Sequence, residues 1–284
     1  NVSSGKTVLY TPAFAYESVV EAAKNKDLVQ QVDSIVIHWT KQLKNVLNNQ
    51  DSTQNAELSG PLDEIDFWKI RAEDLMGIQR QLEQPEIVSV IELLGHANSA
   101  YLEQFNSLIE QIQRGAREAH NNLKFLESIR PHCWNLRQSA PDKIVTVLPE
   151  LLGRIRLIWA FSQYYNTEHR ITGMLRKVSN EIIHQFRQFI DVSAIFTGNV
   201  ELCIEQLEEA INCGIQWKLI YKRTSACVDT QRNRYGRSWE VDAASVFAQI
   251  DAFVQRCRDL IEVCESQIQF CRKSRQTGGR PGPF

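Results

Sequence analysis

The sequence predicts an all-α protein, an elongated array of helical bundles with long antiparallel helices. Apolar residues recur at alternating spacings of three and four over most of the chain, which places them on single helix faces. No comparable run of period-two alternation supplies strands. Gly60-Pro61 and Pro85 stand where helices begin, and Pro131 and Pro141 bracket a short break.

Two stripes of apolar residues mark helices in the first half of the chain. The first is preceded by an apolar, aromatic segment, residues 9–16, in which Pro12 disfavours an early helix. The second follows Pro61, a residue that is tolerated in the first turn of a helix. The stripes are Val32, Val36, Trp39, Leu43 and Val46, and then Ile65, Trp68, Ala72, Leu75, Gln79 and Leu82.

Residues 144–189 predict a helical hairpin. One stripe ends near Ile158, and Asn166-Thr167-Glu168 then supplies a turn residue, an N-cap and a first-turn acid for the next helix. The arms are Ile144, Leu148, Leu151, Ile155 and Ile158, and then Ile171, Leu175, Val178, Ile182, Phe186 and Phe189. A last stripe comprises Val246, Ile250, Phe253, Cys257, Leu260, Cys264, Ile268 and Cys271.

The predicted core and domains follow from these stripes. The expected core residues are Trp39, Trp68, Trp159, Leu175 and Phe253. Residues 1–30 are expected to form an N-terminal strap and a short helix, residues 31–140 a first bundle, and residues 141–275 a second bundle. Residues 276–284, rich in glycine and proline, read as a connector to a further part of the chain.

Composition favours a soluble, intracellular protein that binds neither nucleic acid nor membrane. The formal net charge of −2 gives no broad attraction to nucleic acid or anionic lipid. The sequence contains no apolar run of 18 or more residues and no signal-peptide pattern, and its first residue is Asn1, so an excised fragment is expected.

The cysteine pattern predicts a reducing compartment and no metal centre. The number of cysteines, seven, is odd, and no C-x-x-C pair occurs. Cys257, Cys264 and Cys271 recur every seven residues along one helix face, about 10 Å apart, which is too far for a disulfide or a shared zinc ion within that helix. They are expected to be unbridged small hydrophobic residues of the core.

Catalytic and cofactor motifs are weak. Ser4-Gly5-Lys6-Thr7 resembles the end of a phosphate-binding loop, but the first glycine of that motif would precede residue 1. Glu181 and His184 have the E-x-x-H spacing of di-iron bundles, which require a second such pair that this sequence lacks. No catalytic residue, cofactor or metal ligand is therefore predicted.

Two groups of residues are candidate interaction sites. Tyr10 and Phe14 belong to a strap that packs on the chain's own bundle or docks onto another domain or chain. Arg232, Arg234 and Arg237 lie in a basic, aromatic stretch that forms either a solvated helix end with its loop or a phosphate-binding surface, of which the solvated surface is favoured.

Several unrelated segments, in one order along almost the whole chain, resemble the N-terminal tail region of dynein heavy chains. The most specific are residues 60–71 (GPLDEIDFWKIR) and residues 158–170 (IWAFSQYYNTEHR). Residues 5–9 (GKTVL) with Pro12, 36–42 (VIHWTKQ), Gln81-Leu82 with Pro85, and 247–253 (FAQIDAF) with Arg256 extend the match. The Tyr164-Tyr165-Asn166-Thr167 form and the tryptophan pattern look more like axonemal chains, including those of the outer arm, than like the cytoplasmic motor.

The resemblance implies a non-catalytic scaffold segment of a microtubule motor, located in the cytoplasm and cytoskeleton, in the axoneme of a cilium or flagellum. The partners that it implies are intermediate chains bearing WD-repeat propellers, light chains, other heavy chains and docking proteins on doublet microtubules. Two other classes stay open. An unrelated coiled-coil or spectrin-like adaptor would show a regular internal repeat, and a helical enzyme would show a convergent polar site.

Overall fold

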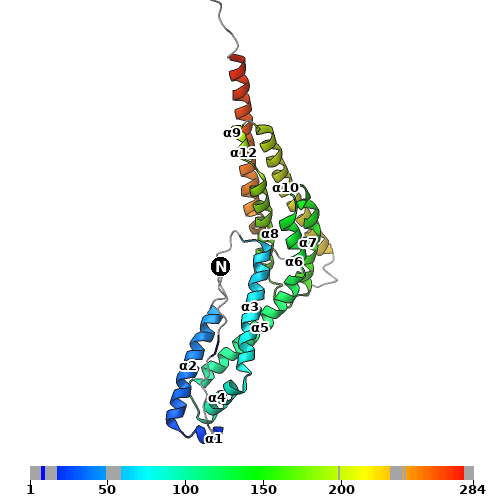
Figure 1. Ribbon diagram of the computed structural model, residues 1–284. Helices are drawn as coiled ribbons and strands as arrows, with labels where there is room; N and C mark the ends of the chain where they lie inside the picture. Colours follow the sequence, from blue (N-terminus) through cyan, green and yellow to red (C-terminus); the bar gives the residue numbers. More distant parts are fainter. Residues whose placement is uncertain are drawn as a thin grey trace, which may run out of the picture. The chain divides into compact units, whose positions relative to one another are not determined.

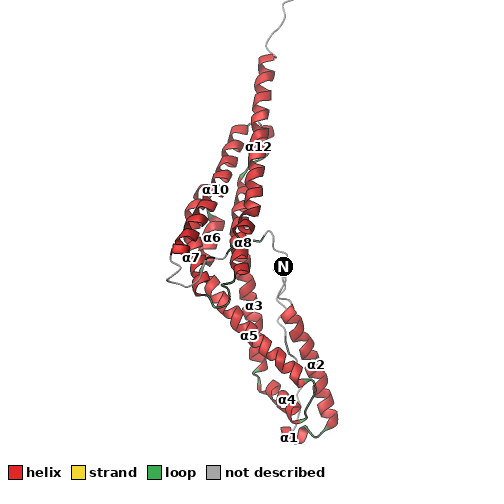
Figure 2. Cartoon of the chain, turned by 180° about the vertical axis from the view of Figure 1, so that it is seen from behind, coloured by secondary structure: helices red, strands yellow, loops and turns green. Residues whose placement is uncertain are grey.

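The computed structural model describes residues 8–9, 18–48, 59–197, 199–230, 239 and 241–277. Over these ranges the regular secondary structure is helical and no strand is found, so the predicted all-α class is confirmed (Figure 2). Within the same ranges, no helix combines the length and the apolarity that a bilayer crossing requires.

The chain forms two compact units. Unit 1 comprises Asn1–Glu57 and Ile65–Lys124, and unit 2 comprises Leu58–Glu64 and Phe125–Phe284. The chain passes between the units inside α3 (Pro61–Leu82) and α5 (Leu102–Glu127). This division differs from the predicted bundles of residues 31–140 and 141–275, because proline and turn signals do not report where one continuous helix leaves one core and joins another.

Unit 1 contains α1 (Val19–Ala22), α2 (Lys26–Asn48), α4 (Pro85–His96) and most of α3 and α5. The predicted stripe of α2 is buried from Val32 to Leu43, whereas Val46 at its end is only half-buried. Trp39 is fully buried, with its ring 5.9 Å from that of Phe105. Pro85 is the first residue of α4, a position at which the backbone N–H has no partner within the helix, so proline costs no hydrogen bond there. Trp68 on α3 also lies in the core of the chain.

Unit 2 contains α6 (Arg130–Gln138), α7 (Pro141–Phe161), α8 (Glu168–Phe189), α9 (Ala194–Thr197), α10 (Val200–Thr230) and α12 (Ala243–Thr277). As predicted, Thr167 is the N-cap of α8, and its hydroxyl accepts a hydrogen bond from the Arg170 N–H at 3.4 Å. Trp159, Leu175 and Phe253 are buried.

Helices α8, α10 and α12 pack side by side in unit 2 (Figure 1). A buried serine joins them: Ser179 of α8 accepts a hydrogen bond from the Trp217 indole of α10 at 3.0 Å and donates one to the Val246 carbonyl of α12 at 3.1 Å. Burial of the hydroxyl is tolerated because both of its hydrogen-bonding roles are satisfied. The contact fixes the relative register of the three helices.

The cysteines whose side chains the structure describes are unbridged, as predicted for Cys257, Cys264 and Cys271. Cys133, Cys203, Cys213, Cys257 and Cys264 are buried. The expected core position of Cys271 was wrong, because most side chains in this last described part of α12 are exposed. Burial raises the pKa of Cys133 and of Cys213 to about 12. Because the thiolate is the reactive form, these thiols are protected both sterically and chemically.

We expect brief treatment of the native chain with a maleimide at neutral pH to modify Cys271 well before the five buried cysteines. Peptide mapping by mass spectrometry measures this order, and the same treatment in denaturant is the control in which the difference disappears. Equal modification of Cys133 and Cys271 in the native chain would contradict the buried position of Cys133.

Candidate functional site

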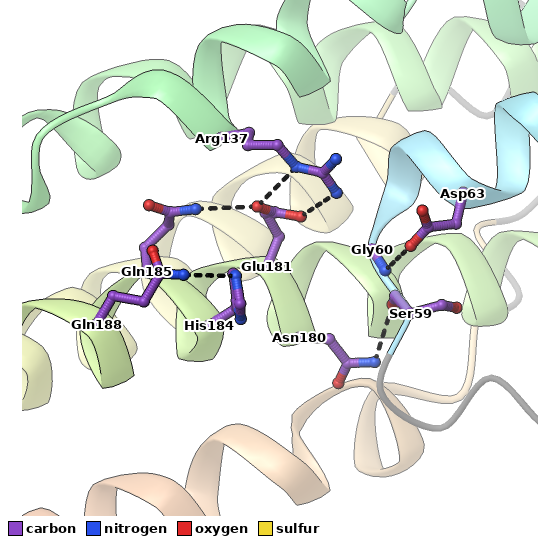
Figure 3. A network of polar contacts seen from close by, with 9 residues as sticks. All are labelled: Ser59, Gly60, Asp63, Arg137, Asn180, Glu181, His184, Gln185 and Gln188. Carbon is purple, nitrogen blue, oxygen red and sulfur yellow. Dashed lines mark hydrogen bonds and ion pairs between the residues drawn. The ribbon is translucent and has the colours of Figure 1, made fainter. Parts of the chain in front are cut away.

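The strongest cluster of buried charge in the described residues lies in unit 2, around the turn that begins α3. We call it the Gly60 clamp, and Figure 3 shows much of it. It joins residues 59–64 to α6, α8 and the turn before α8. Its members are Ser59, Gly60, Asp63, Glu64, Arg137, Tyr165, Lys177, Asn180 and Glu181.

Glu181 of α8 is the most deeply buried charged residue of the clamp, with 3% of its side chain exposed. The Arg137 guanidinium of α6 donates to both of its carboxylate oxygens, from Nη2 at 2.9 Å and from Nε at 3.2 Å. The Gln185 amide donates a third hydrogen bond at 3.0 Å. This two-point pairing satisfies a carboxylate that would otherwise be costly to bury (Figure 3).

Gly60 packs directly against this ion pair. A Cβ atom at position 60 would overlap the Glu181 carboxylate and would lie 3.0 Å from Arg137 Nη2. The Gly60 N–H donates to the Asp63 carboxylate at 2.7 Å, which is the N3-to-N-cap hydrogen bond of a capping box, with Pro61 as the first helical residue. The Asn180 amide donates to the Ser59 carbonyl at 3.2 Å (Figure 3). Glycine is therefore required here for close approach.

The second half of the clamp is centred on Glu64. Its carboxylate accepts a hydrogen bond from the Tyr165 hydroxyl at 3.0 Å and pairs with the Lys177 ammonium. Both charged side chains are 12% exposed, so the pair is shielded from solvent. Burial, then the charge of Glu64 and the hydrogen bond to it, raise the pKa of Tyr165 well above its ordinary value.

The clamp joins helices through paired charges. Its carboxylates accept hydrogen bonds from arginine, lysine, tyrosine or backbone donors. Among the described residues no group of three or more His, Cys, Asp and Glu side chains is arranged to hold a metal ion. Glu181 and His184 diverge: Glu181 points to Arg137, whereas His184 is exposed beside Gln188.

The geometry of the clamp predicts that replacing Gly60 lowers the stability of the fold. Gly60→Ala places a methyl group against a buried carboxylate that Arg137 holds in position, so we expect it to lower the free energy of unfolding by about 2–3 kcal/mol. Chemical denaturation followed by circular dichroism measures this. Gly153→Ala in α7 is the matched control, because nothing lies within 4 Å of its added Cβ and alanine favours a helix. A Gly60→Ala chain as stable as the control would contradict the geometry.

The raised pKa of Tyr165 predicts a stability loss at alkaline pH. The tyrosine of the unfolded chain ionises near pH 10, whereas folded Tyr165 keeps its proton to higher pH. The stability that folded Tyr165 provides by keeping its proton is therefore fully present below about pH 10. It is lost as the pH rises, by about 1.4 kcal/mol per pH unit once the unfolded tyrosine is ionised. Tyr165→Phe should be less stable at pH 8 but lose less stability between pH 10 and 11. Denaturant titrations at these pH values measure the difference, and parallel curves would refute it.

The predicted interaction residues are not among those that the structure describes. Tyr10, Phe14, Arg232, Arg234 and Arg237 lie outside the described residues, so their roles stay predictions. Sequence reasoning treated Glu181 as a polar position beside a core stripe and did not single out Arg137. The one local signal was Gly60-Pro61 followed by Asp63, which marks a capped helix start but does not reveal what the glycine approaches.

Fold and clamp together define a helical protein whose buried polar groups join helices. Comparison with known families makes this specific: residues 29–282 match the family described as "Dynein heavy chain, N-terminal region 1". The chain belongs to the dynein heavy chain family. This bears out the resemblance found in residues 60–71 and 158–170.

Similar curated proteins are axonemal or flagellar heavy chains. The chain is 43% identical over 281 residues to the dynein-1-beta heavy chain of the flagellar inner arm I1 complex of Chlamydomonas reinhardtii. The matched region covers 98% of this chain and 6% of that protein. It is 42% identical over 175 residues to human dynein axonemal heavy chain 2, covering 61% of this chain and 4% of the relative. The beta chain of the Chlamydomonas flagellar outer arm is 28% identical, covering 95% of this chain and 6% of the relative. The chain thus spans only about 6% of the length of the relatives that match almost all of it.

Proposed function

We propose that this chain is a non-catalytic tail segment of an axonemal dynein heavy chain and acts as a structural scaffold on which the motor complex assembles. The observation that carries the proposal is the family match over residues 29–282, which includes all the helices from α3 to α12. The clamp supports it, because buried charge is used to fasten helices together. The unrelated adaptor considered from the sequence loses its basis, since the family is now shown.

The same proposal predicts that the chain has no ATPase activity of its own. The charged groups gathered in the clamp pair with one another across helices, which is the use of buried charge expected of a structural segment. A phosphate-release assay on the purified chain tests this, with a catalytic dynein motor domain as the positive control. Turnover that survives further purification would overturn the non-catalytic role.

We further propose an axonemal location in a cilium or flagellum and a place in an inner-arm type of complex. The support is the higher identity to the inner-arm chain, 43%, than to the outer-arm chain, 28%, over similar lengths. The outer-arm possibility raised by the sequence receives no support from this difference.

The proposed partners are WD-repeat intermediate chains, light chains, other heavy chains and docking proteins of doublet microtubules. Stiff helix bundles present long faces and grooves that suit such contacts. Tagged chain mixed with purified WD-repeat intermediate chains should retain them on affinity resin. If the resin retains light chains or another heavy chain but no intermediate chain, the intermediate-chain site lies elsewhere on the heavy chain.

The candidate interaction residues allow a sharper test of these partners. Phe14→Asp, or Arg232, Arg234 and Arg237 changed to glutamate, should reduce retention while leaving the helical circular dichroism signal intact. The control is a variant with the same change of net charge at other positions. In it three exposed arginines are changed to glutamate: Arg114, Arg154 and Arg258. Equal loss of binding in this control would show that charge alone, and not those sites, governs retention.

A further inference from the structure

Helices α10 and α12 lie antiparallel in unit 2, and their contacts fix which residues face one another (Figure 1). The rings of Trp217 and Phe247 are 6.0 Å apart, and a Cβ added at Gly214 would come within 2.7 Å of Val254. Continuing this register by three turns, backward along α10 and forward along α12, brings Cys203 opposite Cys264.

The two cysteines do meet at that point. Both side chains are completely buried, and Cys203 lies close enough to Cys264 to influence the ionisation of its thiol. Burial, with the neighbouring Cys203 as a second cause, raises the pKa of Cys264 to about 11. Two buried cysteines opposite one another on antiparallel helices are an unusual way to fill a core position, since apolar side chains would fill the same space without an oxidisable group.

The other described cysteines are not paired in this way. Cys257 and Cys271 are each seven residues from Cys264 along α12, about 10 Å away. The register that places Gly214 against Val254 offsets Cys213 from Cys257 by about one turn. The juxtaposition is therefore specific to residues 203 and 264.

We propose that Cys203 and Cys264 form a latent disulfide site, at which a small-molecule disulfide oxidises the two thiols and fastens α10 to α12. One cysteine, as its thiolate, attacks a sulfur of the small disulfide and releases one small thiol. The second cysteine then attacks the mixed disulfide and releases the other. The protein loses two protons and two electrons, and the oxidant becomes two thiols.

The position of the pair allows this reaction but makes it slow. Leu202 and Val263, the residues beside the two cysteines, are exposed, so the pair lies just beneath the surface of the bundle. Both thiols are buried, so the small disulfide reaches them only when the helices open locally. Once formed, the bond would close a loop of about 60 residues, which stabilises the folded state by restricting the unfolded chain.

The test uses the whole 284-residue chain, incubated at neutral pH with oxidised glutathione, then alkylated, digested and mapped by mass spectrometry. We expect a Cys203–Cys264 disulfide as the main intramolecular product of the native chain, and a rise in melting temperature of about 10 °C that a reductant reverses. In denaturant the same oxidant should give mixed pairings with no preference for this one.

Two variants make the result decisive. Cys203→Ala should abolish both the cross-link and the rise in melting temperature, and Cys213→Ala, the same substitution three turns along α10, should keep both. The proposal is overturned if the native chain stays unlinked under conditions that oxidise it in denaturant. It is equally overturned if the bond forms but lowers the melting temperature, because the native geometry would then not accommodate it.

Discussion

Replacing Arg137 with alanine is expected to lower the free energy of unfolding by about 3 kcal/mol, because it leaves the Glu181 carboxylate buried without its cation. The guanidinium is one-third exposed, so water can replace part of its contribution, which places the loss at the lower end of the range for broken buried pairs. Urea denaturation followed by circular dichroism measures the change.

Two comparisons isolate this ion pair. Arg130→Ala, on the same helix, removes an ion pair with Glu127, whose side chain is 41% exposed and stays hydrated without its partner, so it should cost less than about 1 kcal/mol. Adding Glu181→Gln to Arg137→Ala removes the stranded charge and should recover part of the stability. If Arg137→Ala and Arg130→Ala cost the same small amount, the clamp does not hold unit 2 together.

Truncating Trp159 to alanine should cost about 3–5 kcal/mol. Its side chain is 6% exposed and its ring lies 5.9 Å from that of Trp239, so the substitution opens a cavity and removes an aromatic contact. Differential scanning calorimetry, with the chain refolded to establish reversibility, measures the loss.

Trp134 provides the matched control, since it is also in unit 2 but is 54% exposed. Trp134→Ala should change the stability by less than about 1 kcal/mol. An unchanged melting temperature for Trp159→Ala would contradict the burial of this ring. A large loss for Trp134→Ala would instead show that the exposed ring contributes to packing.

Much of the fold could be predicted because helix signals are local. The stripe from Val32 to Leu43 lies on one helix face within four turns, and its burial follows from spacing alone. Thr167 was identifiable as an N-cap because the cap and the hydrogen-bonded N–H are three residues apart. Pro85 could be placed at a helix start because the preference of proline for the first turn is also local.

The clamp could not be predicted, because its partners are distant in the sequence. Arg137 and Glu181 are separated by 44 residues and Glu64 and Lys177 by 113, and no periodicity links such positions. Glu181 occupies a position beside Ile182 that the helical pattern leaves polar, so its burial depends on tertiary packing. Only the glycine at position 60 gave a hint, and glycine before proline is more often a turn than a close approach.

The most direct test of the scaffold role is the binding of WD-repeat dynein intermediate chains to the purified 284-residue chain, measured by isothermal titration calorimetry with and without ATP. We predict saturable binding with a defined stoichiometry and an affinity that ATP does not change, since the segment is proposed to assemble the complex and not to catalyse. A chain that is fully helical by circular dichroism yet gives no binding heat and retains no other dynein subunit would contradict the proposed role.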